Sequence, residues 1–364
     1  MSKTIKPQKG IVYECYKGFT DFSGDRCRAG QKFVYWDDYG PNGYLMDKAS
    51  GRGIDIVIPK DKFAAHFCPA AEQTETKVKS KFKVGDKIIV RKTKKRGVVI
   101  TKITGQKLSK DIKLNVAGVS ATALLNETEV DCGFEIEIHK GIKPGSGIGS
   151  SAASSAGSVF AINQLIGKPY SNKELVKFAM EGEKAASGSL HADNVAAVLL
   201  GGFTFVKNSS KNDYFKLNSP IELAFTIIHP QIEIKTSDSR AIVKKNVSIK
   251  EMTEQSANIG SFVTGLYTED YELIGRSIED NVIEPLRSIL IPKFNELKKT
   301  SLYDGALGCG ISGSGPSVFA ISKGASTAKK VGASMGEIYN ELDLEHDIHI
   351  SYVNDIGIKI LEIK

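Results

Sequence analysis

The segment from residue 141 to residue 157 combines residue types that can hold a phosphate group. Its first half is rich in glycine, and its second half consists of small residues that are compatible with a helix. Glycines let backbone N–H groups approach phosphate oxygens, and a helix N-terminus adds about half a positive charge. Ser150 and Ser151 would place hydroxyls in the first turn, where they can cap the helix or reach a magnesium ion. The segment therefore predicts an anion site at the start of a helix.

Two common phosphate-binding motifs do not fit this segment. A Walker A loop ends in Gly-Lys followed by Ser or Thr, whereas Gly149 is followed directly by two serines. A dinucleotide-binding fingerprint is formally present from Gly147 to Ala152, but the strand expected before it alternates in polarity instead of being uniformly apolar. A glycine turn that only precedes a tightly packed helix remains an alternative interpretation.

A carboxylate and a polar turn follow the predicted phosphate site. Ser171 and Glu174 have the spacing of a capping box, which predicts that a second helix begins there. Glu183 lies near the end of this helix, and His191 and Asn194 follow shortly after it. Each of these side chains alone is more typical of a surface or a cap. Magnesium often binds one or two carboxylates together with phosphate oxygens, so the combination favours a cation site beside the phosphate.

A further glycine-rich segment lies at residues 304–316, directly before an apolar strand at residues 317–321. So many glycines before a strand suggest a backbone that wraps closely around a ligand. A glycine-rich hairpin without a ligand would have the same composition. The segment therefore supports a binding site only in combination with the first one.

The elements that would position these segments are a mixture of strands and helices. Residues 134–139 alternate strictly, which predicts a half-buried strand with Phe134, Ile136 and Ile138 facing inward. This pattern is typical of an antiparallel sheet with helices on one face. Further strands are expected at 88–90 and 98–103, and further helices at 117–126, 150–166 and 172–187.

The composition changes near residue 70 and divides the chain. Residues 1–72 are rich in aromatic and turn residues and contain short strand patterns, which predicts a small, barrel-like β-rich module. Its cysteines include no Cys-x-x-Cys pair, so a zinc site is not favoured. Residues 73–83 contain alternating lysines and are expected to form a linker or an edge strand.

The overall composition is ordinary for a globular protein. Of 364 residues, 41% are hydrophobic and 25% are charged, and the net charge of +7 is too small to indicate a nucleic-acid binder. No stretch approaches the roughly 18 apolar residues of a membrane-spanning helix, and the polar N-terminus has no signal-peptide core. The five scattered cysteines imply no disulfide framework. We therefore expect a cytoplasmic protein that binds neither nucleic acid nor membrane.

The two glycine-rich segments, in this order, resemble two motifs of the GHMP small-molecule kinases. Residues 143–153 are similar to the phosphate loop of that family, and residues 308–316 are similar to its third motif. Four other segments resemble the homoserine kinases in particular: 182–194, 201–204, 235–240 and 284–292. The similarity spans about residues 84–364. It implies an α+β, two-layer fold with mixed, largely antiparallel sheets, an ATP-binding region at 84–205 and a C-terminal region at 206–364.

The resemblance also implies a reaction, its cofactors and an assembly. Homoserine kinases phosphorylate the side-chain hydroxyl of L-homoserine with ATP and Mg²⁺ in threonine biosynthesis, and the family suggests a homodimer. Magnesium would be held by Ser151 and Glu183, and adenine would lie by Asn115. The residues that would contact the ATP phosphates belong to the two glycine segments: Pro144, Gly145, Ser146, Gly147, Ile148, Gly149, Ser150, Ser151, Gly313 and Gly315.

The same resemblance assigns the acceptor side of the site. Homoserine would be bound by His191, Arg240 and Arg287, and the forked donors of arginine suit its carboxylate. Asn194 and Thr236 would lie near the reacting hydroxyl. Asn194 stands where mevalonate kinase has an aspartate base, which fits a reaction driven by positioning and by stabilisation of phosphate charge.

One feature of the family is missing from this chain. The first GHMP motif has the form Pro-x-x-x-Asn-x-Gly-Pro-Gly-Phe-Asp and contributes to homoserine binding, and residues 1–86 contain no such segment. We therefore expect ATP binding to persist and homoserine turnover to be slow. Two alternatives remain: another GHMP small-molecule kinase, and a non-catalytic fusion in which the β-rich module binds a partner.

Overall fold

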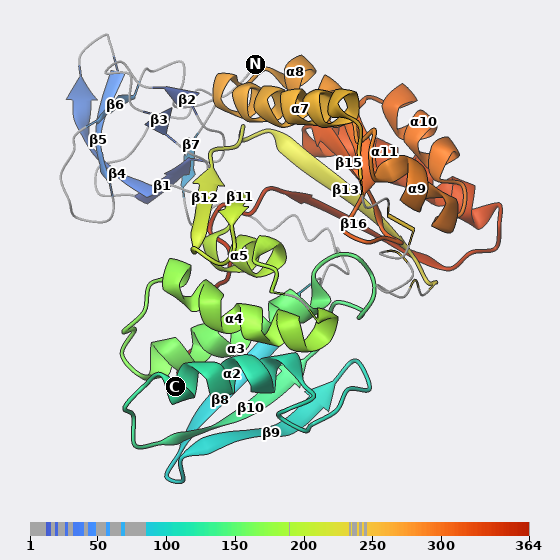
Figure 1. Cartoon of the computed structure of the whole chain (residues 1–364). Helices are drawn as coiled ribbons and strands as arrows, with labels where there is room; N and C mark the ends of the chain where they lie inside the picture. Colours follow the sequence, from blue (N-terminus) through green and yellow to red (C-terminus); the bar gives the residue numbers. More distant parts are fainter. Residues whose placement is uncertain are drawn as a thin grey trace. The chain divides into compact units, whose positions relative to one another are not determined.

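The chain divides into two compact units, Met1–Lys81 and Phe82–Lys364. The computed structural model describes short strands within residues 12–69 and then residues 85–363, with gaps at 189, 233, 235–238, 240–241 and 244–245. Figure 1 shows the strands of the first unit in blue and the second unit in cyan to red. The linker expected at residues 73–83 lies outside the described residues.

The described part of the first unit consists of antiparallel strands. One sheet has the order β6-β5-β4-β1-β7, and β2 pairs with β3. The strands are β1 (Val12–Cys15), β2 (Phe19–Thr20), β3 (Arg26–Cys27), β4 (Lys32–Tyr39), β5 (Gly43–Lys48), β6 (Ile56–Ile58) and β7 (Phe67–Pro69). A β-rich unit therefore precedes the larger one.

The second unit begins with a three-stranded sheet of β8 (Lys87–Thr93), β10 (Gly133–His139) and β9 (Gly97–Thr104), in that order. The central strand β10 is antiparallel to β8 and parallel to β9. Because parallel neighbours need a crossover, α2 (Val116–Asn126) connects β9 to β10 across one face. Phe134, Ile136 and Ile138 are at most 1% exposed, which confirms the inward face predicted from their alternation.

Two further helices pack with α2 over this sheet (Figure 1). They are α3 (Ser150–Leu165) and α4 (Asn172–Ser187). α3 follows β10 directly, so the glycine loop between them joins the central strand of the sheet to a helix N-terminus. The capping box at Ser171 and Glu174 is present as predicted. After α4, the short helix α5 (Asp193–Leu200) leads into the hairpin of β11 (Phe203–Asn208) and β12 (Asp213–Leu217).

The C-terminal part of the second unit contains a four-stranded antiparallel sheet. Its order is β14 (Ala306–Ile311), β15 (Val318–Lys323), β13 (Leu223–Pro230) and β16 (His346–Tyr352). Side chains alternate across a strand, so Val318 and Ala320 pack beneath α10 (Phe294–Tyr303) and α11 (Ala325–Asn340). On the other face, Phe319 and Ile321 pack with α7 (Ile249–Thr268) and α8 (Tyr271–Arg276).

Mixed and antiparallel sheets with covering helices give the α+β fold class that the sequence predicts. Between α8 and α10, the chain forms the short helices α9 (Glu284–Arg287) and η1 (Ser288–Leu290). None of the helices that the structure describes has the length and apolar character needed to cross a bilayer.

Candidate active site

The loop between β10 and α3 has the backbone geometry of an anion cradle. Gly145, Gly147 and Gly149 have φ angles of 74°, 79° and 77°, a left-handed conformation that residues with a side chain rarely adopt. The space beside Gly145, where a Cβ would lie, is open. Gly149 is the N-cap of α3, and no side chain of the described residues caps this helix. The first-turn N–H groups of α3 are therefore available to an anion from outside the helix.

The second glycine loop packs directly against the first. It joins β14 to β15 and is closed by a hydrogen bond of 2.8 Å from the Ser312 N–H to the Ser317 carbonyl. The Ser312 hydroxyl donates to the carbonyl oxygen of Gly147 at 2.9 Å. A Cβ at Gly147 would lie only 2.4 Å from the Ser312 carbonyl oxygen, so only glycine fits there. The two glycine-rich loops, which are separate motifs in the sequence, are thus in direct contact.

Glu183 of α4 faces the first turn of α3. Its Oε2 accepts a hydrogen bond of 3.1 Å from the Ser151 hydroxyl. Burial raises the pKa of the Glu183 carboxyl, and the hydrogen bond from Ser151 opposes this shift. The described residues contain no cluster of three or more His, Cys, Asp or Glu side chains that could enclose a metal. One carboxylate and one hydroxyl at a phosphate site suit an ion such as Mg²⁺, which takes phosphate oxygens and waters as its other ligands.

The start of α5 lies at the same end of α3. The nearest heavy atom to a Cβ built on Gly149 is Oδ1 of Asn194, at 3.9 Å. His191 precedes α5 and is exposed. The structure therefore brings the Asn194 side chain to the glycine loop before α3.

Arg287 lies at the other glycine loop. Its Nη1 donates to the carbonyl oxygen of Gly313 at 3.0 Å, and its Nε donates to the carbonyl oxygen of Ser239 at 3.3 Å. Ser239 is itself buried and donates to the carbonyl oxygen of Ser314 at 2.9 Å. Arg287 therefore joins two segments at the site. Thr236 and Arg240, the two other residues expected nearby, lie outside the described residues.

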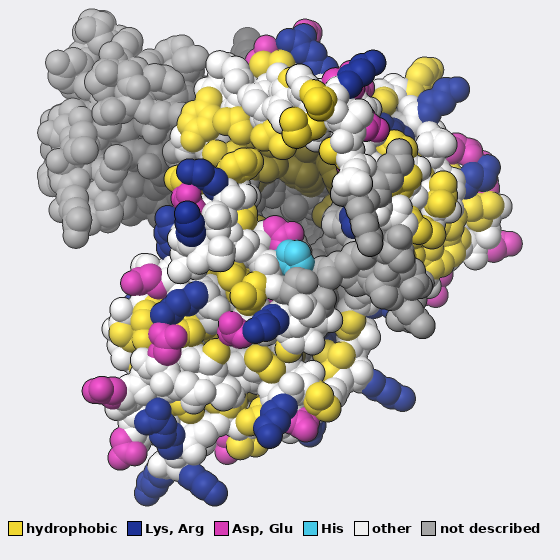
Figure 2. Space-filling view, viewed as in Figure 1, with side chains coloured by type: hydrophobic (Ala, Val, Ile, Leu, Met, Phe, Trp, Pro, Cys, Tyr) yellow, Lys and Arg dark blue, Asp and Glu magenta, His cyan; other side chains and the backbone are white. Residues whose placement is uncertain are grey.

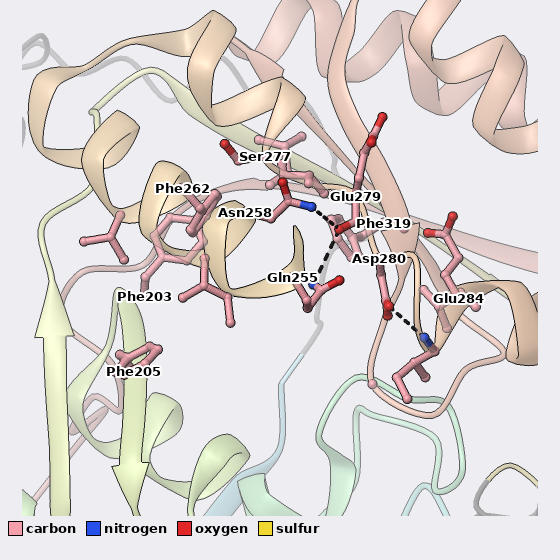
Figure 3. A pocket seen from close by; sticks show the side chains of 18 of the residues that line it. Phe203, Phe205, Gln255, Asn258, Phe262, Ser277, Glu279, Asp280, Glu284 and Phe319 are labelled. Atoms are coloured by element: carbon pink, nitrogen blue, oxygen red, sulfur yellow. Dashed lines mark hydrogen bonds between the residues drawn. The ribbon is translucent and has the colours of Figure 1, made fainter. Parts of the chain in front are cut away.

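A cavity of about 440 Å³ extends from Gly313 and Arg287 along the α7 side of the four-stranded sheet. Figure 2 shows its hollow, walled by hydrophobic side chains. In Figure 3, Phe203, Phe262 and Phe319 from three different elements surround the space. Sequence reasoning did not find this cavity, because its walls come from elements that are far apart in the chain.

The cavity also has a polar side. The side-chain amides of Gln255 and Asn258 donate to the carbonyl oxygen of Glu279, and the Asp280 carboxylate accepts from the Ile283 N–H at 2.7 Å (Figure 3). Glu284 is paired with Lys298. Burial raises the pKa of Glu284, while the hydrogen bond from Lys298 opposes this shift.

Comparison with known proteins assigns this arrangement to a family. The sequence profile of the GHMP kinases N terminal domain matches residues 115–202, and that of the GHMP kinases C terminal matches residues 262–341. A homoserine kinase from Chlorobium phaeobacteroides (strain BS1) is 40% identical over 291 residues, which cover 76% of this chain and 91% of the relative. The chain belongs to the GHMP kinase family.

Solved structures place this GHMP kinase among enzymes of the same fold. The crystal structure of homoserine kinase from Cytophaga hutchinsonii is 45% identical, with a TM-score of 0.73, and the match covers 75% of this chain and 87% of that chain. Mevalonate kinase from L. major has the same fold at 14% identity, with a TM-score of 0.56 over 75% of this chain and 86% of that chain. The resemblance and the fold expected from the sequence are both confirmed.

Asn115, expected beside adenine, is buried at the N-terminus of α2 in this kinase. Its Oδ1 accepts from the Ala117 N–H at 3.0 Å, and its Nδ2 donates to the Ser109 carbonyl at 2.8 Å. The side chain thus caps α2 and fixes the loop before it. The Asn115 side chain has a structural role that its sequence context did not indicate.

A buried ion pair beneath the phosphate loop of the kinase was also missed. The side chains of Lys140 and Asp86 are 2% and 1% exposed and form a salt bridge. Lys140 also donates to the Ser150 carbonyl at 2.7 Å, and Asp86 accepts from the Gly141 N–H at 3.1 Å and the Ser154 hydroxyl at 2.8 Å. Burial lowers the pKa of Lys140, and Asp86 opposes this shift. The pair therefore connects the start of the loop, at Gly141, with the first turns of α3, at Ser150 and Ser154. The sequence signal for this pair is limited to a lysine directly after the alternating strand.

Proposed function

We propose that this kinase transfers the γ-phosphoryl group of ATP to the side-chain hydroxyl of L-homoserine and forms O-phospho-L-homoserine, a step of threonine biosynthesis. The observation that carries the proposal is the direct contact between the two glycine loops beside Arg287 and the cavity. Curated relatives at about 40% identity are homoserine kinases, which supports this choice of acceptor over other alcohols.

The phosphate groups of ATP would lie at the N-terminus of α3. The open space beside Gly145 leaves room for them. The first-turn N–H groups of α3 provide hydrogen-bond donors that favour negative charge. Gly313 and Gly315 of the third motif would close the site from the other side. Adenine would lie near the N-terminus of α2, which Asn115 caps.

We propose that Ser151 and Glu183 hold Mg²⁺. Their hydrogen bond brings a hydroxyl and a buried carboxylate to the phosphate loop, which is a donor set that fits this ion. When bound, Mg²⁺ supplies positive charge that offsets the charge on the phosphates.

Homoserine would bind between α5 and the third glycine motif. Asn194 would contact it from α5, and His191 from the segment before that helix. Arg287 would contact it from α9, and Thr236 and Arg240 would complete the pocket. Asn194 carries an amide and cannot act as a general base at neutral pH. Phosphoryl transfer depends mainly on alignment and on electrostatic stabilisation, so these residues would act by orienting the hydroxyl towards the phosphate.

We also propose that turnover is slow compared with a relative that has the first GHMP motif, because residues 1–86 lack it. A buried polar group of the substrate without its partner costs about 1–3 kcal/mol. The kcat of this chain should therefore lie below that of the Cytophaga hutchinsonii homoserine kinase. Replacement of residues 1–83 by a family N-terminal segment should raise it, and equal kcat values for both natural chains would refute this part. On the family resemblance, we further propose a homodimer.

The proposed activity is tested with the purified full chain by coupled release of ADP. With ATP and Mg²⁺, we expect ADP to appear when L-homoserine is added and not when mevalonate or galactose is added. A second arm measures ATP binding without any acceptor. A chain that binds ATP but gives higher turnover with another alcohol would show that the acceptor is misassigned.

A further inference from the structure

His229 is buried at the end of β13, next to the third glycine motif. The residue is 2% exposed, and its Nδ1 lies 3.1 Å from the hydroxyl oxygen of Ser317. Ser317 stands just before β15, and its hydroxyl donates to the carbonyl oxygen of Ser146 at 2.6 Å. These three residues form a continuous line of hydrogen bonds from the four-stranded sheet to the phosphate loop.

The direction of these hydrogen bonds follows from the number of protons. A carbonyl oxygen only accepts, so the single hydroxyl proton of Ser317 points to Ser146. The Ser317 oxygen can then only accept from the histidine ring, so Nδ1 of His229 carries a proton. Nε2 of His229 is buried and has no hydrogen-bond partner among the described residues, which fits the unprotonated nitrogen of a neutral ring.

Burial and the Lys143 charge favour this neutral form, and together they outweigh the opposing Asp347 carboxylate. Lys143 approaches from the phosphate loop, and Asp347 and His349 face His229 from β16. Burial, followed by the positive charge of Lys143, lowers the pKa of His229 to about 4. At neutral pH the ring is therefore an uncharged donor to Ser317.

The Ser146 carbonyl belongs to the peptide unit that carries the Gly147 N–H. Because a trans peptide is planar, its C=O and N–H point in opposite directions, and a fixed carbonyl also fixes the N–H. The Ser317 N–H makes a second, longer contact of 3.4 Å with the same carbonyl. The Ser312 hydroxyl holds the next carbonyl, that of Gly147, in the same way. Successive backbone N–H groups fixed in this manner form a concave anion site.

We propose that His229 is a positioning residue for ATP: it orients Ser317, and Ser317 holds the phosphate loop in the conformation that binds phosphate. His229 itself touches no substrate. This inference goes beyond the proposed function, because it concerns the ATP side of the site and holds whichever alcohol accepts the phosphate.

A second link from the same end of β13 supports the proposal. Lys143 of the phosphate loop donates to Oε1 of Gln231 at 2.9 Å, and Nε2 of Gln231 donates to Asp347 at 2.7 Å. The end of β13 is therefore connected to the phosphate loop by two separate series of hydrogen bonds, one through Ser317 and one through Gln231. The His229 chain is the buried one, so its hydrogen bonds are shielded from water.

The test is equilibrium binding of ATP, measured by calorimetry on the full chain without any acceptor. His229→Leu removes the donor, and we expect ATP to bind roughly 2- to 12-fold more weakly, the range for one lost neutral hydrogen bond. His229→Asn can place an amide N–H where Nδ1 lies, so we expect it to restore most of the affinity. His346→Asn, on the neighbouring strand β16, serves as the matched control and should leave ATP affinity unchanged.

A double-mutant cycle separates positioning from a general structural effect. Since His229 acts through Ser317, His229→Leu should add no further loss of ATP affinity in a Ser317→Ala background. Additive losses, or equal ATP affinity in His229→Leu and the natural chain, would overturn the proposal. Should His229→Leu not fold, the comparison of His229→Asn with Ser317→Ala decides: the first should bind ATP nearly normally and the second weakly. ATP binding needs no homoserine, so failure here is distinct from failure of the proposed acceptor.

Discussion

The Ser312 hydroxyl donates a hydrogen bond of 2.9 Å to the carbonyl oxygen of Gly147, although the two residues are 165 positions apart in the sequence. This contact joins the two glycine motifs of the kinase directly. It also leaves no room for a side chain at Gly147, since a Cβ there would lie 2.4 Å from the Ser312 carbonyl oxygen.

Gly147→Ala should therefore separate the two loops. The new Cβ meets backbone atoms that cannot move away cheaply, and φ at this position is 79°. We expect ATP affinity to fall at least 10-fold, measured by calorimetry. Gly167→Ala is the control, because φ is 91° there but nothing lies within 4 Å of a Cβ. It should lower stability by about 1–2 kcal/mol and leave ATP affinity intact. Similar ATP affinities for both variants would contradict the role of the contact.

Glu183→Gln tests the proposed magnesium ligand. The substitution keeps the shape of the side chain and removes the charge, so magnesium-dependent turnover should fall by two orders of magnitude or more, as measured by initial rates. Because burial raises the pKa of Glu183, a neutral side chain is well tolerated in the fold, and the melting temperature should not decrease. Glu181→Gln, on the same helix α4, is the control and should keep near-normal rates. Normal activity of Glu183→Gln would remove this residue from the metal site.

Arg240 and Arg287 should respond differently to substitution by alanine. A hydrogen bond to a charged group contributes about 1.5–3 kcal/mol, so Arg240→Ala should raise the homoserine KM about 10- to 150-fold and change the ATP KM little. Arg287 also holds the carbonyl oxygens of Gly313 and Ser239, so Arg287→Ala should raise both KM values. Steady-state kinetics with each substrate varied in turn measures this. An equal rise of both KM values in Arg240→Ala would argue against a specific homoserine contact.

The low pKa of His229 predicts that this residue makes the folding stability of the protein decrease at acidic pH. A histidine in the unfolded chain has a pKa of about 6.5, whereas burial and Lys143 lower it to about 4 in the fold. Between these values the unfolded chain binds a proton that the folded chain does not, so the free energy of unfolding decreases as the pH falls. The contribution of His229 to the free energy of unfolding is about 3 kcal/mol. It is fully present above the pKa of the unfolded chain and is lost as the pH falls towards 4.

Urea unfolding at a series of pH values measures this component. His229→Asn cannot titrate, so its free energy of unfolding should depend less steeply on pH between about 6.5 and 4. Lys143, Asp347 and His349 remain in both proteins, and the difference between the two curves therefore isolates His229. Parallel curves would show that His229 does not titrate as described.

Folding stability should decrease more when one partner of the buried Lys140–Asp86 pair is removed than when both are removed. Asp86→Leu leaves the Lys140 ammonium buried without its counter-ion, which should cost about 3–5 kcal/mol of folding stability. Lys140→Met combined with Asp86→Leu leaves no buried charge and should recover part of the loss. Urea unfolding of the single and double variants measures both effects, and an additive loss in the double variant would rule out coupling between the two residues.

Local features of the site could be predicted from the sequence because short-range rules determine them. The alternation of Phe134, Ile136 and Ile138 predicts their inward face, and the spacing of Ser171 and Glu174 predicts a capping box. The glycine loop before Ser150 predicts the start of α3, because left-handed φ angles and an uncapped helix N-terminus both follow from residue type.

Features that depend on contacts between distant segments could not be predicted. The pair of Asp86 and Lys140, the contact of His229 with Ser317, and the cavity all combine residues from separate elements. Each residue alone is ordinary for its place: a lysine at a strand end, or a histidine in an apolar strand. Strand pairing brings Asp86 to Lys140, and the packing of the two glycine loops brings His229 close to the phosphate loop through Ser317.

Phosphorus NMR of the full chain with ATP, Mg²⁺ and L-homoserine shows whether this GHMP kinase makes O-phospho-L-homoserine. We expect a phosphate monoester signal of O-phospho-L-homoserine that grows with time, matches the ADP formed and grows at least about 100-fold more slowly in Glu183→Gln. ADP formation at the same rate with and without homoserine, and no monoester signal, would contradict the proposed reaction.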